Sequence, residues 1–233
     1  MTAAYALFYE LGLPGPYVKK EENAKPTPVV IYGASTAVGA FTIKLASIAD
    51  IHPIIAIGSS TSDFIKPFLD ESKGDALVDY KAHKSPESLV DAIKEALAKS
   101  GVPQGRAFHG FDTISEEGTF DKIMSNVLAG SPAEGTSQRP KLSVILPGKN
   151  YDAVDKSIDL STTYVGKAHT EEGKKFATIW CTLFSKGLFE GWFTPHPYEV
   201  MPGGLGGLSE ALISLKNGEV RAKKMVGRPA ETQ

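Results

Sequence analysis

The sequence has 233 residues but only one cysteine, Cys181. The chain can therefore form no internal disulfide and no cysteine-rich zinc site, and such usage is typical of a reducing compartment. We expect a cytoplasmic protein. The largely apolar neighbours of Cys181 favour a packed thiol over a nucleophile. The histidines are scattered without a pair at metal-ligand spacing, so we expect no bound metal.

An excess of charge of one sign is also absent. The chain has 25 Lys and Arg against 27 Asp and Glu, and its basic residues form no long block. This balance gives no general attraction to nucleic acid or to anionic membranes. No apolar run approaches the length of a membrane-spanning helix, and the first residues lack the pattern of a signal peptide. We expect neither nucleic acid nor a membrane as a partner.

The composition that is present, 42% hydrophobic and 22% charged residues, is typical of a globular protein with a large core. From Pro28 onward, short β-rich runs alternate with stretches of helical period, which indicates βαβ units and a parallel sheet. We expect an α/β fold with a Rossmann-type doubly wound sheet. The expected strands span residues 28–32, 53–57, 76–80, 107–113, 142–146 and 158–166, and the expected helices 38–48, 63–73, 85–97, 120–128 and 170–187.

Three regions are expected along the chain. Residues 1–25 form a short helix over 2–11, closed by a glycine, and a linker; residues 26–194 form the main domain; residues 195–233 form a final unit. In that unit a row of leucines precedes a terminal strand over 220–226. The Gly-, Pro- and Ser-rich segment 130–140 is expected to be a loop.

The turn between the first strand and the first helix is a candidate phosphate site. A strand that ends in a glycine-rich turn and continues into a helix points backbone N–H groups and the positive helix end at one place. Only Gly33 and Gly39 remain of the usual G-x-G-x-x-G pattern, so an ordinary turn of another α/β fold explains this segment equally well. The hydroxyls of Ser35 and Thr36 can donate to phosphate oxygens, and Gly39 would let the helix pack tightly on the sheet.

The end of the second strand indicates which dinucleotide would bind. NAD-binding domains place Asp or Glu there, about 20 residues after the turn, for the ribose 2′-OH. This sequence has Ser59 and Ser60 instead, and a 2′-phosphate could be held by hydroxyls of residues 59–62 with Lys66 one turn later. The same serines could simply cap the next helix, and both roles are compatible. Asp63 is expected as a first-turn carboxylate favoured by the helix dipole, not as a ribose ligand.

Several segments, in matching order, resemble the zinc-independent quinone oxidoreductase and enoyl reductase branch of the medium-chain dehydrogenase/reductase superfamily, especially its fungal members. The resemblance covers almost the whole chain and is far more specific than the glycine turn alone. The segments that carry it are 2–8 with 11–14, 32–39, 78–80, 111–113, 196–200 with 202–207, and 222–228.

The resemblance implies that the chain binds NADP(H). Tyr80, at the end of the third strand, would contact the cofactor, although from its sequence position alone a half-buried structural tyrosine is preferred. Leu146 and Pro147, after the fifth strand, would lie beside the nicotinamide. The full set of implied cofactor-binding residues is Gly33, Ser35, Thr36, Ala37, Val38, Gly39, Ser59, Ser60, Ser62, Lys66, Tyr80, Leu146 and Pro147.

In one respect this chain differs from the family that it resembles. Its members begin with a GroES-like substrate domain, whereas this chain starts within the helix that normally follows it. Most substrate-facing groups would lie in that preceding domain, so we assign no catalytic residue. Residues 195–233 would be a helix-strand remnant of the same domain, leaving Val220, Met225 and Val226 without strand partners. The strand 162–166 would be the edge through which two copies pair into a homodimer.

The function expected from the resemblance is that of an NADPH-dependent oxidoreductase. The nicotinamide would deliver hydride to a small-molecule electrophile: a quinone, an enone or an enoyl thioester. The alternative is a truncated, non-catalytic NADP(H)-binding or interaction module. A short-chain dehydrogenase is disfavoured because that class needs a Tyr with a Lys four residues later, whereas Tyr151 is followed at that distance by Asp155 and Lys156 is one position too far.

Overall fold

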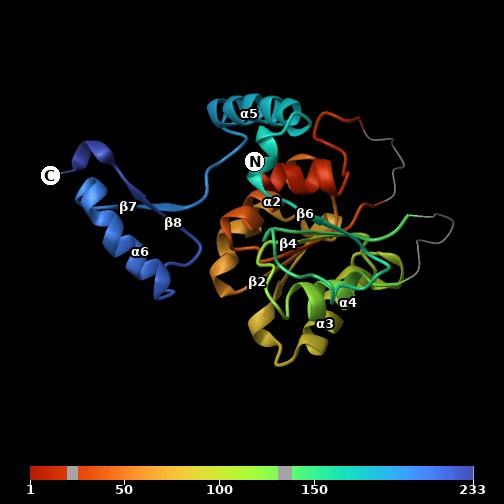
Figure 1. The fold of residues 1–233 in the computed structure, drawn as a ribbon. Helices are drawn as coiled ribbons and strands as arrows, with labels where there is room; N and C mark the ends of the chain where they lie inside the picture. The colour runs from red at the N-terminus through yellow and green to blue at the C-terminus, as the bar shows by residue number, and fades with distance from the viewer. Residues whose placement is uncertain (20–25, 131–137, 233) are drawn as a thin grey trace.

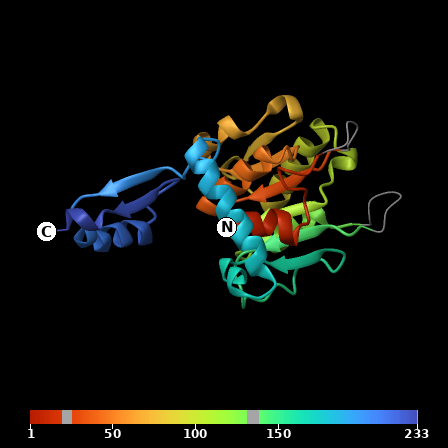
Figure 2. The same ribbon diagram turned by 90° about the horizontal axis from the view of Figure 1, so that it is seen from above.

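The computed structural model describes residues 1–19, 26–130 and 138–232. Its larger part is a six-stranded parallel sheet with helices on both faces, and a smaller C-terminal unit extends to one side (Figure 1). Figure 2 shows that the chain crosses between the two parts through the segment that follows α5 (Gly173–Glu190). The expected α/β Rossmann-type architecture is confirmed.

The strand order of the sheet is β3-β2-β1-β4-β5-β6, and all neighbours are parallel. The order changes direction beside β1, where β4 pairs with its other edge. In open α/β sheets, ligands bind at the carboxyl ends of the strands next to such a point. The strands are β1 (Val29–Tyr32), β2 (Ile54–Gly58), β3 (Ala76–Asp79), β4 (His109–Asp112), β5 (Lys141–Val144) and β6 (Asp159–Thr162).

The helices between the strands follow the expected order, but not all of them are α-helices: within the expected helix 120–128, η6 (Phe120–Met124) is a π-helix. A single helix is expected over 63–73, but η2 (Ser60–Phe68) and η3 (Glu71–Lys73) are both 3₁₀ helices. Pro67 explains the difference, because a proline ring clashes with the preceding helical turn and has no N–H to donate. The others are α1 (Thr2–Ala4), η1 (Tyr5–Glu10), α2 (Ala37–Ile48), η4 (Tyr80–Ala82), α3 (Pro86–Lys99), η5 (Pro103–Gly105), η6 (Phe120–Met124), α4 (Ser125–Leu128) and η7 (Val165–His169).

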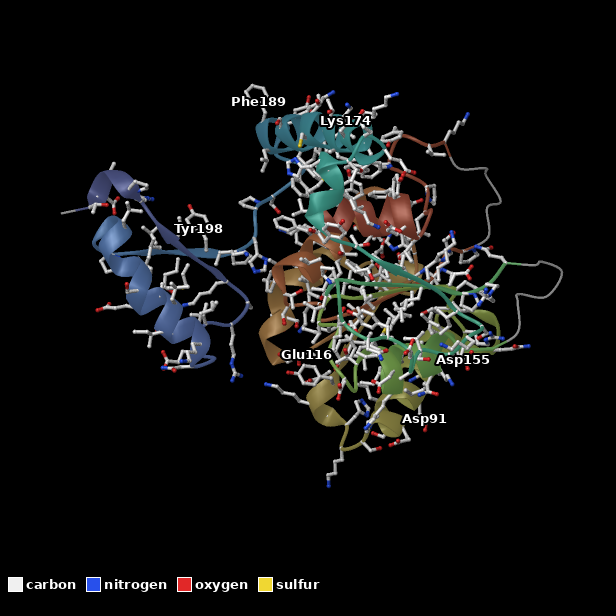
Figure 3. The ribbon with its side chains drawn as sticks, viewed as in Figure 1. Asp91, Glu116, Asp155, Lys174, Phe189 and Tyr198 are labelled. Atoms are coloured by element: carbon white, nitrogen blue, oxygen red, sulfur yellow. The ribbon has the colours of Figure 1, made fainter. Side chains whose placement is uncertain are left out.

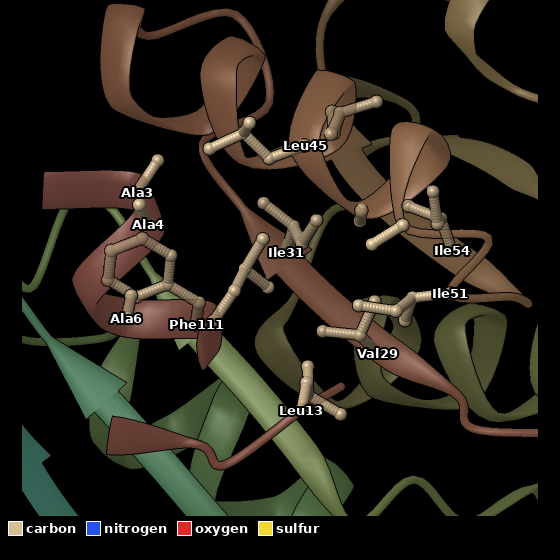
Figure 4. Close-up of a cluster of buried hydrophobic side chains, with 14 of the residues drawn as sticks. Ala3, Ala4, Ala6, Leu13, Val29, Ile31, Leu45, Ile51, Ile54 and Phe111 are labelled. Carbon is tan, nitrogen blue, oxygen red and sulfur yellow. The ribbon is translucent and has the colours of Figure 1, made fainter. Parts of the chain in front are cut away.

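Two hydrophobic clusters, one on each face, bury the sheet. Ile31 of β1 faces the cluster formed with α2, η1 and α5, in which Phe111 lies nearby (Figure 4). Trp180 of α5 belongs to the same cluster. Val30, one position before Ile31, faces the opposite cluster with Leu97 of α3. Neighbouring residues of a strand point to opposite faces, so a strand covered on both sides must be apolar throughout. This explains the continuous hydrophobic runs that mark β1 and β2.

The expected sixth strand is shorter than predicted. It ends at Thr162, because β5 ends at Val144 and the last ladder bond runs from the Thr163 N–H to the Val144 carbonyl (2.7 Å). Tyr164 lies beyond the strand and is exposed, and η7 begins at the next residue. The expectation of a strand edge over 162–166 is therefore wrong, and the edge strand on this side of the sheet is Asp159–Thr162.

The C-terminal unit consists of a two-stranded parallel sheet and a helix. Met225 of β8 pairs with Glu199 of β7, and Val226 pairs with Val200. The expectation that these β8 residues lack a strand partner is therefore wrong, whereas Val220 lies outside any strand. The elements are β7 (Tyr198–Met201), η8 (Gly204–Gly207), α6 (Leu208–Lys216), β8 (Lys224–Gly227) and η9 (Pro229–Glu231).

Helix α5 differs from the expectation at its cysteine. Cys181 is exposed, so the predicted packed thiol is wrong; the preceding Trp180 takes the buried position instead and stacks on Phe8. Phe189, at the C-terminal end of the same helix, is exposed (Figure 3). In the part of the chain that the structure describes, no helix combines the length and apolarity needed to cross a bilayer.

Candidate cofactor site

The turn after β1 brings helix and strand so close that two glycines are required. Gly33 has φ +82°, and a Cβ there would lie 2.5 Å from Thr113 Oγ1. A Cβ on Gly39 would lie 2.2 Å from the Gly33 carbonyl oxygen. These separations are too short for any side chain. The first turn of α2 therefore rests directly on the backbone that leaves the sheet.

Thr36 begins α2 as its N-cap. Its Oγ1 accepts a hydrogen bond from the Gly39 N–H (2.9 Å) and lies 2.9 Å from Thr113 Oγ1. The Thr113 hydroxyl in turn donates to the Tyr32 carbonyl (2.8 Å), so the Thr36 hydroxyl proton is directed at Thr113. Ser35 makes no such side-chain bond within the described residues. Of the two hydroxyls expected at a phosphate, that of Ser35 is the one left free to donate.

The turn after β2 is built from its own serines. A capping box joins Ser59 and Ser62, in which the Ser62 Oγ accepts from the Ser59 N–H (3.1 Å). Ser62 is fully buried, and a Cβ on Gly58 would lie 2.3 Å from its Oγ. Its hydroxyl thus stabilises the start of η2 and does not face solvent. The Ser60 side chain lies outside the described part of the structure.

A cavity of about 710 Å³ joins the two turns to the C-terminal unit. From the sheet side it is lined by Ser35, Thr36 and Ala37 of the first turn, Ser59 of the second, and Tyr80 after β3. Three consecutive strand ends therefore bring five of the expected cofactor-binding residues to one wall. The opposite wall consists of His196, α6 and the segment 218–225.

The charge of this cavity is positive. Its lining includes the side chains of Lys81, Arg221, Lys223 and Lys224 and no carboxylate. Lys223 forms an ion pair with Glu199, which leaves three cations without a carboxylate partner among the described residues. An anion would be favoured here, since the field of several like charges converges on one hollow. The sequence reasoning missed these residues, although three basic residues within 221–224 are a visible signal.

Lys66 lies elsewhere. Together with Ser59 it lines a second hollow of about 470 Å³, whose charged lining is otherwise the carboxylates Asp63, Glu71, Asp75 and Asp79. The Lys66 Nζ is 2.8 Å from Asp63. This acidic lining disfavours a phosphate, so the present arrangement does not bring Lys66 together with the first cavity.

The loop that follows β4 is held by Asp112. Its buried carboxylate accepts hydrogen bonds from the N–H groups of Ile114 (2.9 Å) and Ser115 (2.8 Å) and from the Thr119 hydroxyl (2.6 Å). Burial raises the pKa of Asp112 in spite of these bonds. Both carboxylate oxygens of Asp112 therefore accept hydrogen bonds from this loop.

The expected nicotinamide-side residues, Leu146 and Pro147, follow β5 and are exposed. They do not line the cavity just described, and neither do Val38, Gly39 and Ser62. The structure thus brings together several of the residues expected at the phosphates and leaves those expected beside the nicotinamide exposed. Among the described residues, no group of three or more His, Cys, Asp or Glu side chains is placed to hold a metal ion.

The strand order and the tight turn into α2 define a Rossmann-type domain. No family model matches the sequence. It is 36% identical over 202 residues to the trans-enoyl reductase fsr4 of Gibberella fujikuroi, covering 87% of this chain and 55% of that protein. It is 26% identical over 234 residues to the trans-enoyl reductase phm4 of Pyrenochaetopsis sp, covering 97% of this chain and 60% of that protein.

Solved structures show the same fold. The CurK enoyl reductase superposes with a TM-score of 0.68 at 14% identity, over 98% of this chain and 59% of that one. CurA from Vibrio vulnificus, solved in complex with NADPH, gives 0.61 at 16% identity, over 97% of this chain and 61% of that one. The chain is therefore similar in sequence to trans-enoyl reductases and in fold to solved enoyl reductases, and it spans a little over half the length of these relatives.

Proposed function

We propose that the chain is the NADP(H)-binding part of an enoyl reductase-like enzyme. The observation that carries the proposal is the cavity in which Ser35, Ser59 and Tyr80 face cations and no carboxylate. Its chemistry fits a dinucleotide with an additional phosphate, because a 2′-phosphate is repelled by the carboxylate that an NAD-binding domain places after the second strand. NADH would lose these contacts, so the site is expected to prefer NADPH.

The chain's own residues would bind and orient the cofactor. The free N–H groups at the start of α2 and the Ser35 hydroxyl suit the pyrophosphate. Ser59 and Lys81, with Arg221 from the opposite wall, suit the 2′-phosphate. When bound, the nicotinamide would supply the hydride for an electrophilic carbon. This division leaves the C-terminal unit as one half of the cofactor site.

The substrate class proposed is an enoyl compound, with enones and quinones as close chemical relatives, because the similar proteins are named trans-enoyl reductases. No described residue is assigned a catalytic role. A homodimer formed through the sheet edge Asp159–Thr162 and a cytoplasmic location stay predictions.

Fluorescence titration of NADPH against NADH tests the cofactor preference. We expect NADPH to bind more tightly, and Lys81→Met to weaken NADPH about tenfold, the worth of one charge-assisted hydrogen bond, with little effect on NADH. Lys84→Met is the matched control, since Lys84 is an exposed lysine that does not line the cavity. Equal affinity for both dinucleotides, or no binding of either, would contradict the proposal.

A second candidate is an NADP(H)-binding module without turnover. It is favoured by the apolar residues that α6 exposes, such as Leu212 and Ile213, which suit an interaction surface. An assay of NADPH oxidation with a short enoyl thioester separates the two. Binding of NADPH without oxidation supports the module; steady oxidation supports the enzyme.

A further inference from the structure

His196 occupies an unusual place at the entrance to the C-terminal unit. Its ring packs edge to face on Phe64 of η2 (5.1 Å between centroids) and against Phe41 of α2 (6.3 Å). Both helices begin at the cavity, α2 after Thr36 and η2 after Ser59, and His196 itself lines it. The imidazole therefore lies on the wall of the cavity, against the two helices that begin at the turns where the dinucleotide phosphates would bind.

The imidazole is buried and incompletely bonded. Only 7% of His196 is exposed, and its Nδ1 has no hydrogen-bond partner among the described residues. An unpaired buried nitrogen is costly, and such groups usually have a ligand or a function. Here the nitrogen belongs to a residue on the wall of a cavity that has the properties of an anion site.

The charged groups facing His196 are cations. Lys44 approaches from α2 and Lys224 from β8, and with burial these charges lower the pKa of His196. No carboxylate lines the cavity to offset them. The ring is therefore neutral near pH 7 without ligand, and an anion is the partner that would reverse this balance.

We propose that His196 is a phosphate-binding residue of the dinucleotide site and takes up a proton from solvent when NADP(H) binds. The proposal rests on the proposed function. A phosphate beside the ring supplies a negative charge that the residues lining the cavity do not. This charge favours the protonated imidazolium over the neutral ring, and the imidazolium donates a hydrogen bond to a phosphate oxygen. The phosphate is either the pyrophosphate or the 2′-phosphate, since His196 lies near both turns.

The direction of the pH effect follows from proton linkage. The pKa of His196 is low without cofactor and higher with it, so binding takes up a proton at pH values between the two. Affinity therefore rises as pH falls through this window, by about tenfold per pH unit at most. Below the lower pKa the ring is protonated in both states and the effect ends.

Isothermal titration calorimetry of the chain with NADPH, in two buffers of different ionisation enthalpy between pH 5.5 and 8, measures the protons taken up. We expect uptake in the wild type and a reduction by up to one proton in His196→Gln, whose amide keeps a hydrogen-bond donor without titrating. The wild-type minus variant difference isolates His196, because a phosphate monoester also titrates near pH 6. His169→Gln, at an exposed histidine outside the cavity, is the matched control and should leave the uptake unchanged.

A second measurement needs no variant. NMR of the histidine ring protons of the wild type should show one imidazole whose pKa rises when NADPH is added. Repeating both measurements with NADH, which lacks the 2′-phosphate, identifies the ligand: an effect kept with NADH assigns the pyrophosphate, and an effect seen only with NADPH assigns the 2′-phosphate.

Three outcomes would overturn the inference. If His196→Gln takes up as many protons as the wild type, or if no imidazole changes its pKa, His196 does not bind phosphate although the proposed function stands. If neither NADPH nor NADH binds to the wild type, the proposed function fails and the inference fails with it.

Discussion

The Nζ of Lys44 lies 2.9 Å from the carbonyl oxygen of Pro195, although the two residues are 151 positions apart. The same ammonium donates to the carbonyl (3.1 Å) and hydroxyl (3.0 Å) oxygens of Thr194 and lies over the ring of Phe68. Lys44 is only 3% exposed, so this side chain holds the segment that leads into the C-terminal unit against α2. The C-terminal wall of the proposed site is thereby attached to α2, the helix that begins at the opposite wall.

Lys44→Met should destabilise the chain and weaken cofactor binding. The methionine fills similar volume but leaves three acceptors without a donor, a loss we expect to cost about 2–4 kcal/mol after the gain from not burying a charge. Urea unfolding measures the loss of stability, and titration with NADPH measures the loss of affinity expected when the segment is no longer held against α2. Lys84→Met is again the control for removal of a lysine. An unchanged midpoint for Lys44→Met would show that the contact contributes nothing.

Lys44 also predicts a pH effect of defined sign. Burial lowers its pKa below the value in the unfolded chain, so the unfolded state binds the proton more readily between the two values. Stability should therefore rise with pH across that alkaline window. Comparing the pH dependence of unfolding in the wild type and Lys44→Met isolates this contribution, which must be missing in the variant.

His109 of β4 predicts a pH effect on stability in the acid range. Burial and the charge of Lys141 lower its pKa from 6.5 to about 4, and the ring is neutral in the folded protein. The unfolded chain binds a proton first, so stability should fall by about 3 kcal/mol as the pH drops from 6.5 to 4. Unfolding of His109→Gln in the same range should be flatter. Parallel profiles for the two proteins would contradict the assignment.

Much of the fold follows from the sequence because its physical signals are local. Buried strands such as β1 and β2 are apolar on both faces, and Ser85 begins α3 by accepting from the Ser88 N–H (3.2 Å) while Pro86 occupies the first turn, as expected. Strand ends were harder to predict, since they depend on neighbours: β6 ends at Thr162 because β5 ends, which no property of residues 162–166 reveals.

The site was partly predictable for the same reason. The two glycines and Ser59 belong to turns whose chemistry can be read locally, and Tyr80 came only from a family resemblance. Arg221 and His196 reach the cavity through the packing of the C-terminal unit. The basic residues within 221–224 are visible in the sequence, but their approach to turns well over a hundred positions away is not. The burial of Ser62 was also not apparent, because a capping serine and a phosphate-binding serine have the same sequence signature.

The two serines after β2 can be separated experimentally. Ser62→Ala removes the acceptor for the Ser59 N–H and should cost about 1 kcal/mol of stability, as for other helix caps, with little change in the preference for NADPH over NADH. Ser59→Ala removes a hydroxyl that both lines the cavity and accepts in the capping box, so it should cost similar stability and, unlike Ser62→Ala, weaken NADPH several-fold more than NADH. A large loss of NADPH affinity in Ser62→Ala, without loss of stability, would return Ser62 to the phosphate site.

Gly39→Ala tests whether the close approach at the first turn is required. The added Cβ would meet the Gly33 carbonyl oxygen at 2.2 Å, and because that atom is backbone, α2 must move away from the sheet. We expect a loss of about 1–3 kcal/mol in stability, typical of overpacking with a backbone shift, and a loss of NADPH binding because the N–H groups of the first turn are displaced. Gly206→Ala is the matched control, since nothing lies within 4 Å of a Cβ there and its φ is not positive. Differential scanning calorimetry and cofactor titration measure the two losses; a Gly39→Ala protein that binds NADPH as tightly as the wild type would show that the phosphates do not rest on this turn.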